Sequence, residues 1–146
     1  MSHIDFVGKL HRSTPRDYVG GVLEADKAEC AAIACQWGKD YWDGERKFGY
    51  GGYRYDGRWR PVAEEMIAHY RLPPDASILD VGCGKGFLLY EFAQLLPKAT
   101  VTGLDISAYA INNAKEEVRN ACVVGDAASL PFPSTSFDLV LSVTTI

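Results

Sequence analysis

The second half of the chain alternates short apolar runs with longer amphipathic segments, which is typical of strands alternating with helices. Apolar runs predict strands over residues 77–81, 99–104, 121–124 and 137–143. Apolar residues three or four apart predict a helix that ends before Pro97 and a second one that Ser107 caps and that carries Val118 inward. The crossovers are long enough to make neighbouring strands parallel, and nearly continuous apolar strands require cover on both faces. We therefore expect an α/β fold around a mostly parallel sheet.

The first 72 residues differ in character, because they are helical and aromatic and precede the Pro73-Pro74 pair. Helices are predicted to start at Thr14-Pro15, to span residues 27–36 and to start again at Pro61. Residues 41–57 are rich in Gly and Tyr without a clear period, which predicts an ordered loop or short helical turns. We therefore divide the chain into an N-terminal helical extension, residues 1–72, and a core domain, residues 73–146.

Composition and charge exclude several classes of protein. The 146 residues suit one core, and 47% hydrophobic against 23% charged residues indicates a packed interior. A formal charge of −4 provides no field that would attract nucleic acid. The N-terminus lacks the features of a signal peptide, and no apolar run reaches the ~18 residues of a membrane span. We expect a cytoplasmic protein without a membrane partner.

The four cysteines are too few for a disulfide scaffold, so we expect reduced thiols. Cys30 and Cys35 are predicted to lie on different faces of a helix, a spacing unlike that of a zinc ligand pair. We interpret both as small buried side chains and expect no metal site.

A glycine-rich turn joins the strand at 77–81 to the next helix, and it is the most informative stretch of the chain. Glycines at 82, 84 and 86 leave room for a ligand at the backbone, so we expect their amides to face a nucleotide-like cofactor. Asp105 ends the second strand, where a carboxylate can accept hydrogen bonds from ribose hydroxyls. Asp126 follows the third strand, in reach of an adenine amino group. Together they predict a nucleotide site at one edge of the sheet.

The glycine spacing distinguishes among nucleotides. A dinucleotide fingerprint, G-x-G-x-x-G, would have its third glycine at Phe87. Lys85 is followed by Gly86 instead of Ser or Thr, so the phosphate-binding P-loop is also missing. A ligand with adenosine and without pyrophosphate is favoured.

Over residues 75–146 the sequence resembles the class I S-adenosylmethionine-dependent methyltransferases of the small bacterial type. Four segments match that family in order: Asp80 to Gly86, Gly103 to Ser107, Gly125-Asp126-Ala127 with Leu130-Pro131-Phe132, and Phe137 to Val140. The resemblance implies a Rossmann-like, doubly wound sheet with strand order 3-2-1-4-5-7-6, of which this chain has the first four strands. It also implies S-adenosyl-L-methionine as the cofactor.

The resemblance further implies a role for each matching residue. The methionine part of the cofactor would be held by Asp80, by the backbone of Gly82, Cys83, Gly84 and Gly86, and by the backbone of Ser142. The adenosine part would be held by Asp105 at the ribose, Ile106 against adenine, and Asp126 with the Ala127 amide at the adenine edge. The implied reaction is in-line attack by a substrate nucleophile on the sulfonium methyl. We nominate no catalytic residue, since His69 is better explained as a structural or solvated histidine.

Residues 41–60 interleave aromatic rings with five cations and three anions, and three interpretations stay open. The segment is a small satellite core, a lid over the cofactor, or a surface that binds nucleic acid through stacking and arginines. The overall charge does not support the third interpretation. In a lid, the substrate side would be lined by Tyr50, Tyr53 and Tyr55, and Arg54 or Arg58 would pair with a carboxylate or phosphate. The segment is also similar to the N-terminal part of methyltransferases of surface-polysaccharide or modified-sugar biosynthesis. That similarity implies a sugar- or phosphate-containing small-molecule acceptor.

The fourth predicted strand would leave residues 139–141 as an apolar edge. Three explanations stay open: the chain is a fragment of a longer protein, which we favour, it forms an edge-to-edge homodimer, or its N-terminal segment covers the edge. For the function, we expect a methyltransferase. The alternative is a catalytically silent module that binds S-adenosylmethionine or S-adenosylhomocysteine as a sensor or partner subunit.

Overall fold

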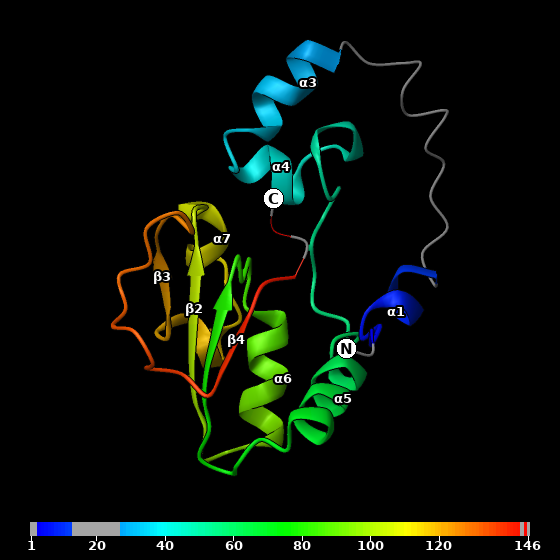
Figure 1. The fold of residues 1–146 in the computed structure, drawn as a ribbon. Helices are drawn as coiled ribbons and strands as arrows, with labels where there is room; N and C mark the ends of the chain where they lie inside the picture. The colour runs from blue at the N-terminus through cyan, green and yellow to red at the C-terminus, as the bar shows by residue number, and fades with distance from the viewer. Residues whose placement is uncertain (1–2, 13–26, 144, 146) are drawn as a thin grey trace. The chain divides into compact units, whose positions relative to one another are not determined.

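A computed structural model describes residues 3–12, 27–143 and 145, and the chain divides into two compact units, residues 1–54 and 55–146. Figure 1 shows the elements of each unit. The division lies before the helix that opens at Arg60, earlier than the boundary at residues 72 and 73 that composition suggested. The reason is that this helix packs on a helix of the sheet unit.

The first unit contains short helices. They are α1 (Gly8–Arg12), α3 (Lys27–Ala34), α4 (Lys39–Asp43) and the 3-10 helix η1 (Arg46–Phe48). Helices α4 and η1 confirm the short helical turns predicted for residues 41–57. Helix α3 confirms the helix predicted over residues 27–36, although it ends at Ala34, two residues earlier. The helix predicted to start at Thr14-Pro15 lies outside the described residues. The expectation of buried thiols is wrong here, because Cys35 is exposed and Cys30 only half-buried.

The second unit contains a four-stranded parallel sheet in the order β3-β2-β1-β4, as expected from the family. The strands are β1 (Ser77–Val81), β2 (Thr100–Asp105), β3 (Cys122–Val124) and β4 (Leu139–Leu141). The helices are α5 (Arg60–Tyr70), α6 (Phe87–Leu95), α7 (Ala108–Asn112) and α8 (Glu116–Arg119). Figure 1 shows α6 running along the sheet with α5 beside it. None of the helices within the described ranges has the length and apolarity to cross a bilayer.

The two faces of the sheet are covered unequally. On one face, Leu89 and Phe92 of α6 are fully buried. On the other face, Leu79 and Leu104 are covered by the partly buried rings of Phe132 and Phe137. Val140 of β4 pairs with Leu79, and Val123 of β3 pairs with Leu104, but both valines are exposed. The expected cover on both faces is therefore wrong at the rim of the sheet, because the loop that carries the two rings reaches only its centre.

The segment after Ser107 forms two helices instead of the one predicted. The Ser107 side chain accepts a hydrogen bond from Ala110 N at 3.0 Å, which confirms it as the N-cap of α7. The helix then breaks because Lys115 N donates to the carbonyl of Lys85 at 2.9 Å, a partner in the glycine turn. The break therefore ties this segment to the turn, and Val118 of α8 is buried as expected.

Candidate functional site

The glycine turn between β1 and α6 needs glycine for its backbone shape. Gly82 and Gly86 have φ angles of +81° and +70°, which side chains rarely adopt. A Cβ at Gly82 would collide with the Thr145 side chain, and a Cβ at Gly86 would approach Val118 Cγ2 to 2.9 Å. The turn is therefore closely packed on both flanks, and sequence reasoning had no signal for Thr145.

The amides of this turn are bound within the protein, so the expectation that they face a ligand is wrong. Gly82 N donates to Leu104 O at 2.7 Å, and Gly86 N donates to Cys83 O at 2.9 Å. Gly84 N donates to Asp105 Oδ2 at 2.7 Å. Buried N–H groups require partners, and β2 supplies most of them here. The turn thus provides a rigid surface without side chains.

Asp105 is the residue that connects the turn to the end of β2. Its Oδ2 accepts the hydrogen bond from Gly84 N, and its Oδ1 accepts one from Ser107 N at 2.8 Å. A carboxylate has about four acceptor positions, so two bound amides orient Asp105 and leave capacity for ligand hydroxyls. Ile106, next in the chain, is 55% exposed. A polar acceptor and an apolar surface therefore lie side by side at the carboxyl end of β2.

A second buried carboxyl group lies in the same region. Burial, and then the charge of Asp105, raise the pKa of Asp80 from 3.8 to about 7. The site therefore concentrates negative charge away from water. A bound cation would favour the ionised form of Asp80, since it would offset both effects.

The raised pKa of Asp80 gives a testable pH dependence. The folded protein binds this proton more tightly than the unfolded chain does, so the free energy of unfolding should fall as pH rises from about 4 to about 7. Asp80→Asn should remove that fall and unfold at higher urea than the wild type at about pH 8. Urea unfolding of both proteins across this range measures it, and parallel pH profiles would contradict the role assigned to burial.

The other predicted cofactor residues lie at the same edge of the sheet, at the carboxyl ends of β3 and β4. Ser142 Oγ donates to Val81 O at 2.9 Å, which places Ser142 beside the start of the turn. Asp126 is exposed and its Oδ1 accepts a hydrogen bond from Ala128 N at 2.8 Å, while Ala127 is also exposed. The neighbouring Gly125 N donates to Asp105 O at 2.9 Å. The turn, Asp105 and Ser142 are thus brought together, with Asp126 one strand away.

The tyrosines predicted for a lid divide between the two units. Tyr50 stacks on the buried Trp42 with ring centroids 5.1 Å apart. The ring centroid of Tyr53 lies 4.5 Å from that of Tyr50. Arg46 donates to Tyr50 O at 2.8 Å. This arrangement is a small aromatic core within the first unit, as the satellite-core interpretation expects of these two rings. The exposed Arg54 ends that unit.

Tyr55 packs against α6 instead. Its hydroxyl donates to Glu91 Oε1 at 2.5 Å, and its ring contacts Phe87 and Tyr90 edge-on. Glu91 is only 1% exposed. Its Oε2 has no hydrogen-bond partner among the described residues and forms an ion pair with Arg60 Nη1 at 3.7 Å. The hydrogen bond with Glu91 raises the pKa of Tyr55 to about 12. Sequence analysis missed Glu91, because an acidic residue on a helix is ordinarily solvated.

Two other candidates are accounted for by local contacts. Arg58 binds Asp56 through a hydrogen bond of 2.7 Å and an ion pair of 2.6 Å. His69 is exposed on α5, and its ring lies 4.8 Å from that of Tyr70. An acidic ligand would therefore compete with Asp56 for Arg58.

Tyr55→Phe should destabilise the protein by about 1–3 kcal/mol, because it leaves both oxygens of the buried Glu91 without a hydrogen bond. Urea unfolding measures the change. Tyr50→Phe is the matched control, since the described contacts of Tyr50 are made by its ring and its backbone, and it should change stability by less than about 0.5 kcal/mol. Equal stabilities of the two variants would show that the bond to Glu91 contributes nothing.

Comparison of the sequence with known proteins finds methyltransferases that match the part of the chain containing this site. Residues 78–146 match the family described as "Methyltransferase domain". The chain is 37% identical over 89 residues to nocamycin O-methyltransferase of Saccharothrix syringae, which covers 56% of this chain and 32% of that protein. It is 34% identical over 90 residues to demethylmenaquinone methyltransferase of Symbiobacterium thermophilum, covering 56% and 36%. The chain thus spans about a third of the length of these relatives.

A solved structure shows the same fold. It is described as a putative S-adenosyl-L-methionine-dependent methyltransferase from Methanococcus maripaludis, with a TM-score of 0.51 and 21% identity over 57% of this chain and 41% of that one. In this chain the parallel sheet has the order β3-β2-β1-β4 that the resemblance implies. Residues 78–146 thus match a methyltransferase domain, and their sheet has the strand order that the resemblance to class I S-adenosylmethionine-dependent methyltransferases implies.

Proposed function

We propose that the protein transfers a methyl group from S-adenosylmethionine to a small-molecule acceptor that contains a sugar or phosphate group. The observation that supports the cofactor part is the hydrogen bond between Gly84 N and Asp105 Oδ2, because it joins the glycine turn to the carboxylate proposed to hold the ribose. Relatives named as methyltransferases of chemically different acceptors support the reaction class and leave the acceptor to experiment.

The residues present fit the proposed cofactor. Asp80 and Asp105 place two carboxyl groups in a buried region. Burial first, and the charge of Asp105 second, impose an electrostatic penalty on ionised Asp80, which raises its pKa. A ligand with an ammonium and a sulfonium group would relieve it. The exposed Ile106 offers an apolar surface for adenine. The cofactor would be held by Asp80, Asp105, Ile106, Asp126, Ala127, Ser142 and the turn of Gly82, Cys83, Gly84 and Gly86.

The chain's own contribution to the reaction is positioning. S-adenosylmethionine supplies a methyl group on a good leaving group, so orientation provides much of the rate. The two amides bound to Asp105 hold its carboxylate in one direction, and Ser142 with Thr145 binds the carbonyl at the end of β1. The site surface is therefore ordered by internal hydrogen bonds before any ligand arrives.

The acceptor class is proposed from the aromatic and basic segment of residues 41–60. Arg54 is exposed, and an acidic group would compete with Asp56 for Arg58, so the segment offers cations to such a group. Tyr50, Tyr53 and Tyr55 supply rings near them in the sequence, although each also packs within its own unit.

Calorimetric titration with S-adenosylmethionine, S-adenosylhomocysteine and NAD tests the cofactor. We expect the two sulfur compounds to bind, and binding of NAD alone would overturn the proposal. Release of S-adenosylhomocysteine with a panel of sugar, phosphate and small-acid acceptors tests the reaction. Binding without turnover across that panel in the full-length protein would favour the silent binding module.

A further inference from the structure

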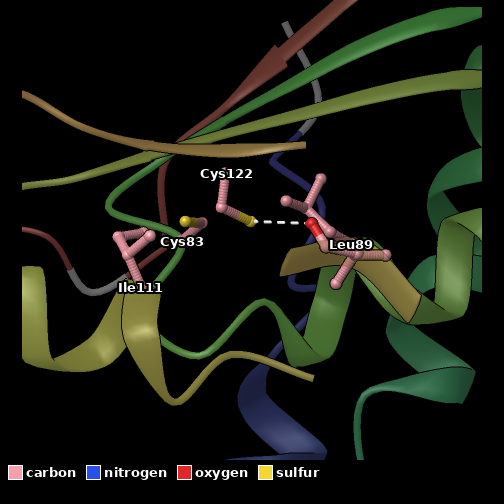
Figure 2. Close-up of a cluster of buried hydrophobic side chains, with 5 residues drawn as sticks. Cys83, Leu89, Ile111 and Cys122 are labelled. Carbon is pink, nitrogen blue, oxygen red and sulfur yellow. Dashed lines mark hydrogen bonds between the residues drawn. The ribbon is translucent and has the colours of Figure 1, made fainter. Parts of the chain in front are cut away.

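Two cysteine thiols border one small buried volume beside the glycine turn. Cys83 lies within the turn and Cys122 is the first residue of β3, and each is only 8% exposed. Figure 2 shows both in one buried cluster with Leu89 and Ile111. They come from segments 39 residues apart in sequence that the fold brings together. Neither side chain has a part in the proposed transfer of a methyl group.

Because Gly103 has no side chain, there is room beside it for both cysteine sulfurs. Gly103 lies on β2 opposite Cys122 in the sheet register. A Cβ at Gly103 would come 2.7 Å from Cys83 Sγ and 2.9 Å from Cys122 Sγ, so both sulfurs border the same small volume. Cys122 Sγ also lies 3.6 Å from the Cβ position of Gly86. The thiol pair therefore touches both β2 and the turn.

The two thiols differ in reactivity. Cys83 Sγ donates to Gly84 O at 3.8 Å and Cys122 Sγ donates to Val118 O at 3.3 Å, the dashed line in Figure 2. Interaction with Cys122, together with burial, raises the pKa of the Cys83 thiol. Interaction with Cys83 lowers the pKa of Cys122. Because the thiolate is the reactive form, Cys122 is the sulfur that attacks an oxidant first, and Cys83 is the one that follows.

We propose that Cys83 and Cys122 are a redox-sensitive pair that a hydroperoxide converts to a disulfide. The Cys122 thiolate attacks one peroxide oxygen and becomes a sulfenic acid, and the other oxygen leaves as water after protonation. The Cys83 sulfur then attacks the Cys122 sulfur and displaces the hydroxyl group as a second water. In sum, two thiols are oxidised, one hydrogen peroxide is reduced, and one disulfide and two waters form.

The disulfide should weaken cofactor binding. Bond formation brings the sulfurs to about 2.05 Å, which pulls Cys83 toward β3. Cys83 N donates to Leu104 O at 3.1 Å, and its neighbour Gly84 donates to Asp105, so movement of Cys83 disturbs the contacts that orient Asp105. This effect on the cofactor rests on the proposed function, whereas formation of the disulfide does not.

The test uses the full chain as a Cys30→Ser, Cys35→Ser variant, in which Cys83 and Cys122 are the remaining thiols. After treatment of the folded protein with hydrogen peroxide, we expect both thiols to resist alkylation and mass spectrometry of a non-reduced digest to find their peptides joined. Two alkylatable thiols, or oxidation that stops at separate sulfinic acids, would overturn the proposal.

The functional consequence is read from S-adenosylmethionine affinity before and after oxidation. We expect oxidation to weaken binding about tenfold and dithiothreitol to restore it. Adding Cys122→Ser or Cys122→Ala should abolish the response, and either variant suffices if the other fails to fold. A disulfide without any change of affinity would overturn the regulatory consequence. A disulfide in a protein that binds no cofactor in either state would overturn the proposed function and leave the pair established.

Discussion

Asp105→Ala should lower the affinity for S-adenosylmethionine about ten- to a hundredfold. Charge-assisted hydrogen bonds to a carboxylate contribute about 1.5–3 kcal/mol, and the proposed ribose contact would be lost. The structure adds a second effect, since the amides of Gly84 and Ser107 lose their acceptor. We expect the free energy of unfolding to fall by about 2–4 kcal/mol. Calorimetric titration measures the first effect, and urea unfolding measures the second.

Asp138→Ala is the matched control for Asp105→Ala. Asp138 Oδ2 accepts hydrogen bonds from Ser77 N at 2.8 Å and from Ser77 Oγ at 3.1 Å, at the opposite end of β1. Its removal should cost about 0.5–1.5 kcal/mol of stability and leave cofactor affinity unchanged. If both variants weakened binding in proportion to their loss of stability, Asp105 would be a structural residue with no contact to the ribose.

Gly103→Ala should destabilise the protein by about 1–3 kcal/mol, although it adds a single methyl group. That methyl would lie 2.7 Å from Cys83 Sγ, 2.7 Å from Leu89 Cδ1 and 2.9 Å from Cys122 Sγ. All three residues are buried and closely packed, so they move only by disturbing the turn, α6 or β3. Urea unfolding measures the loss of stability, and Gly103→Val should cause a larger loss than Gly103→Ala.

Gly38→Ala is the control for adding a methyl group to a glycine. Its Cβ would meet nothing within 4 Å, and its φ of −89° is ordinary for any residue. The free energy of unfolding of the Gly38→Ala variant should therefore differ from that of the wild type by less than about 0.5 kcal/mol. A loss at Gly103 no larger than at Gly38 would show that the space between the two thiols is not closely packed.

The elements of the sheet unit could be predicted because their signals are local. The β1 prediction over 77–81 matches the structure, and β2 differs from its prediction by one residue at each end. Helix α6 ends at Leu95, before Pro97 as predicted. Alternation and helical spacing report directly which residues face a core. The predicted helix after Ser107 is the exception, since it was broken by a hydrogen bond between Lys115 and Lys85, thirty residues apart.

The position of the candidate site was also predictable, whereas its hydrogen bonding was not. Asp105 was expected at the turn because the carboxyl ends of parallel strands meet at one edge of a sheet. The direction of each glycine amide depends on which acceptor lies beside it. The structure assigns those amides to Leu104, Cys83 and Asp105. The sequence does not distinguish a free amide from a hydrogen-bonded one, so the acceptors of these amides could not be predicted from it.

The sequence by itself determined the parallel α/β core, its glycine turn, the acidic strand ends and the match to a methyltransferase domain. These features follow from residue type, spacing and order, which the chain states directly. Only the tertiary structure decided that Tyr55 binds the buried Glu91, that Tyr50 joins the Trp42 cluster, and that Cys83 meets Cys122 over Gly103. Each of these joins side chains through close packing, and packing partners depend on distances in space that no periodicity along the chain encodes.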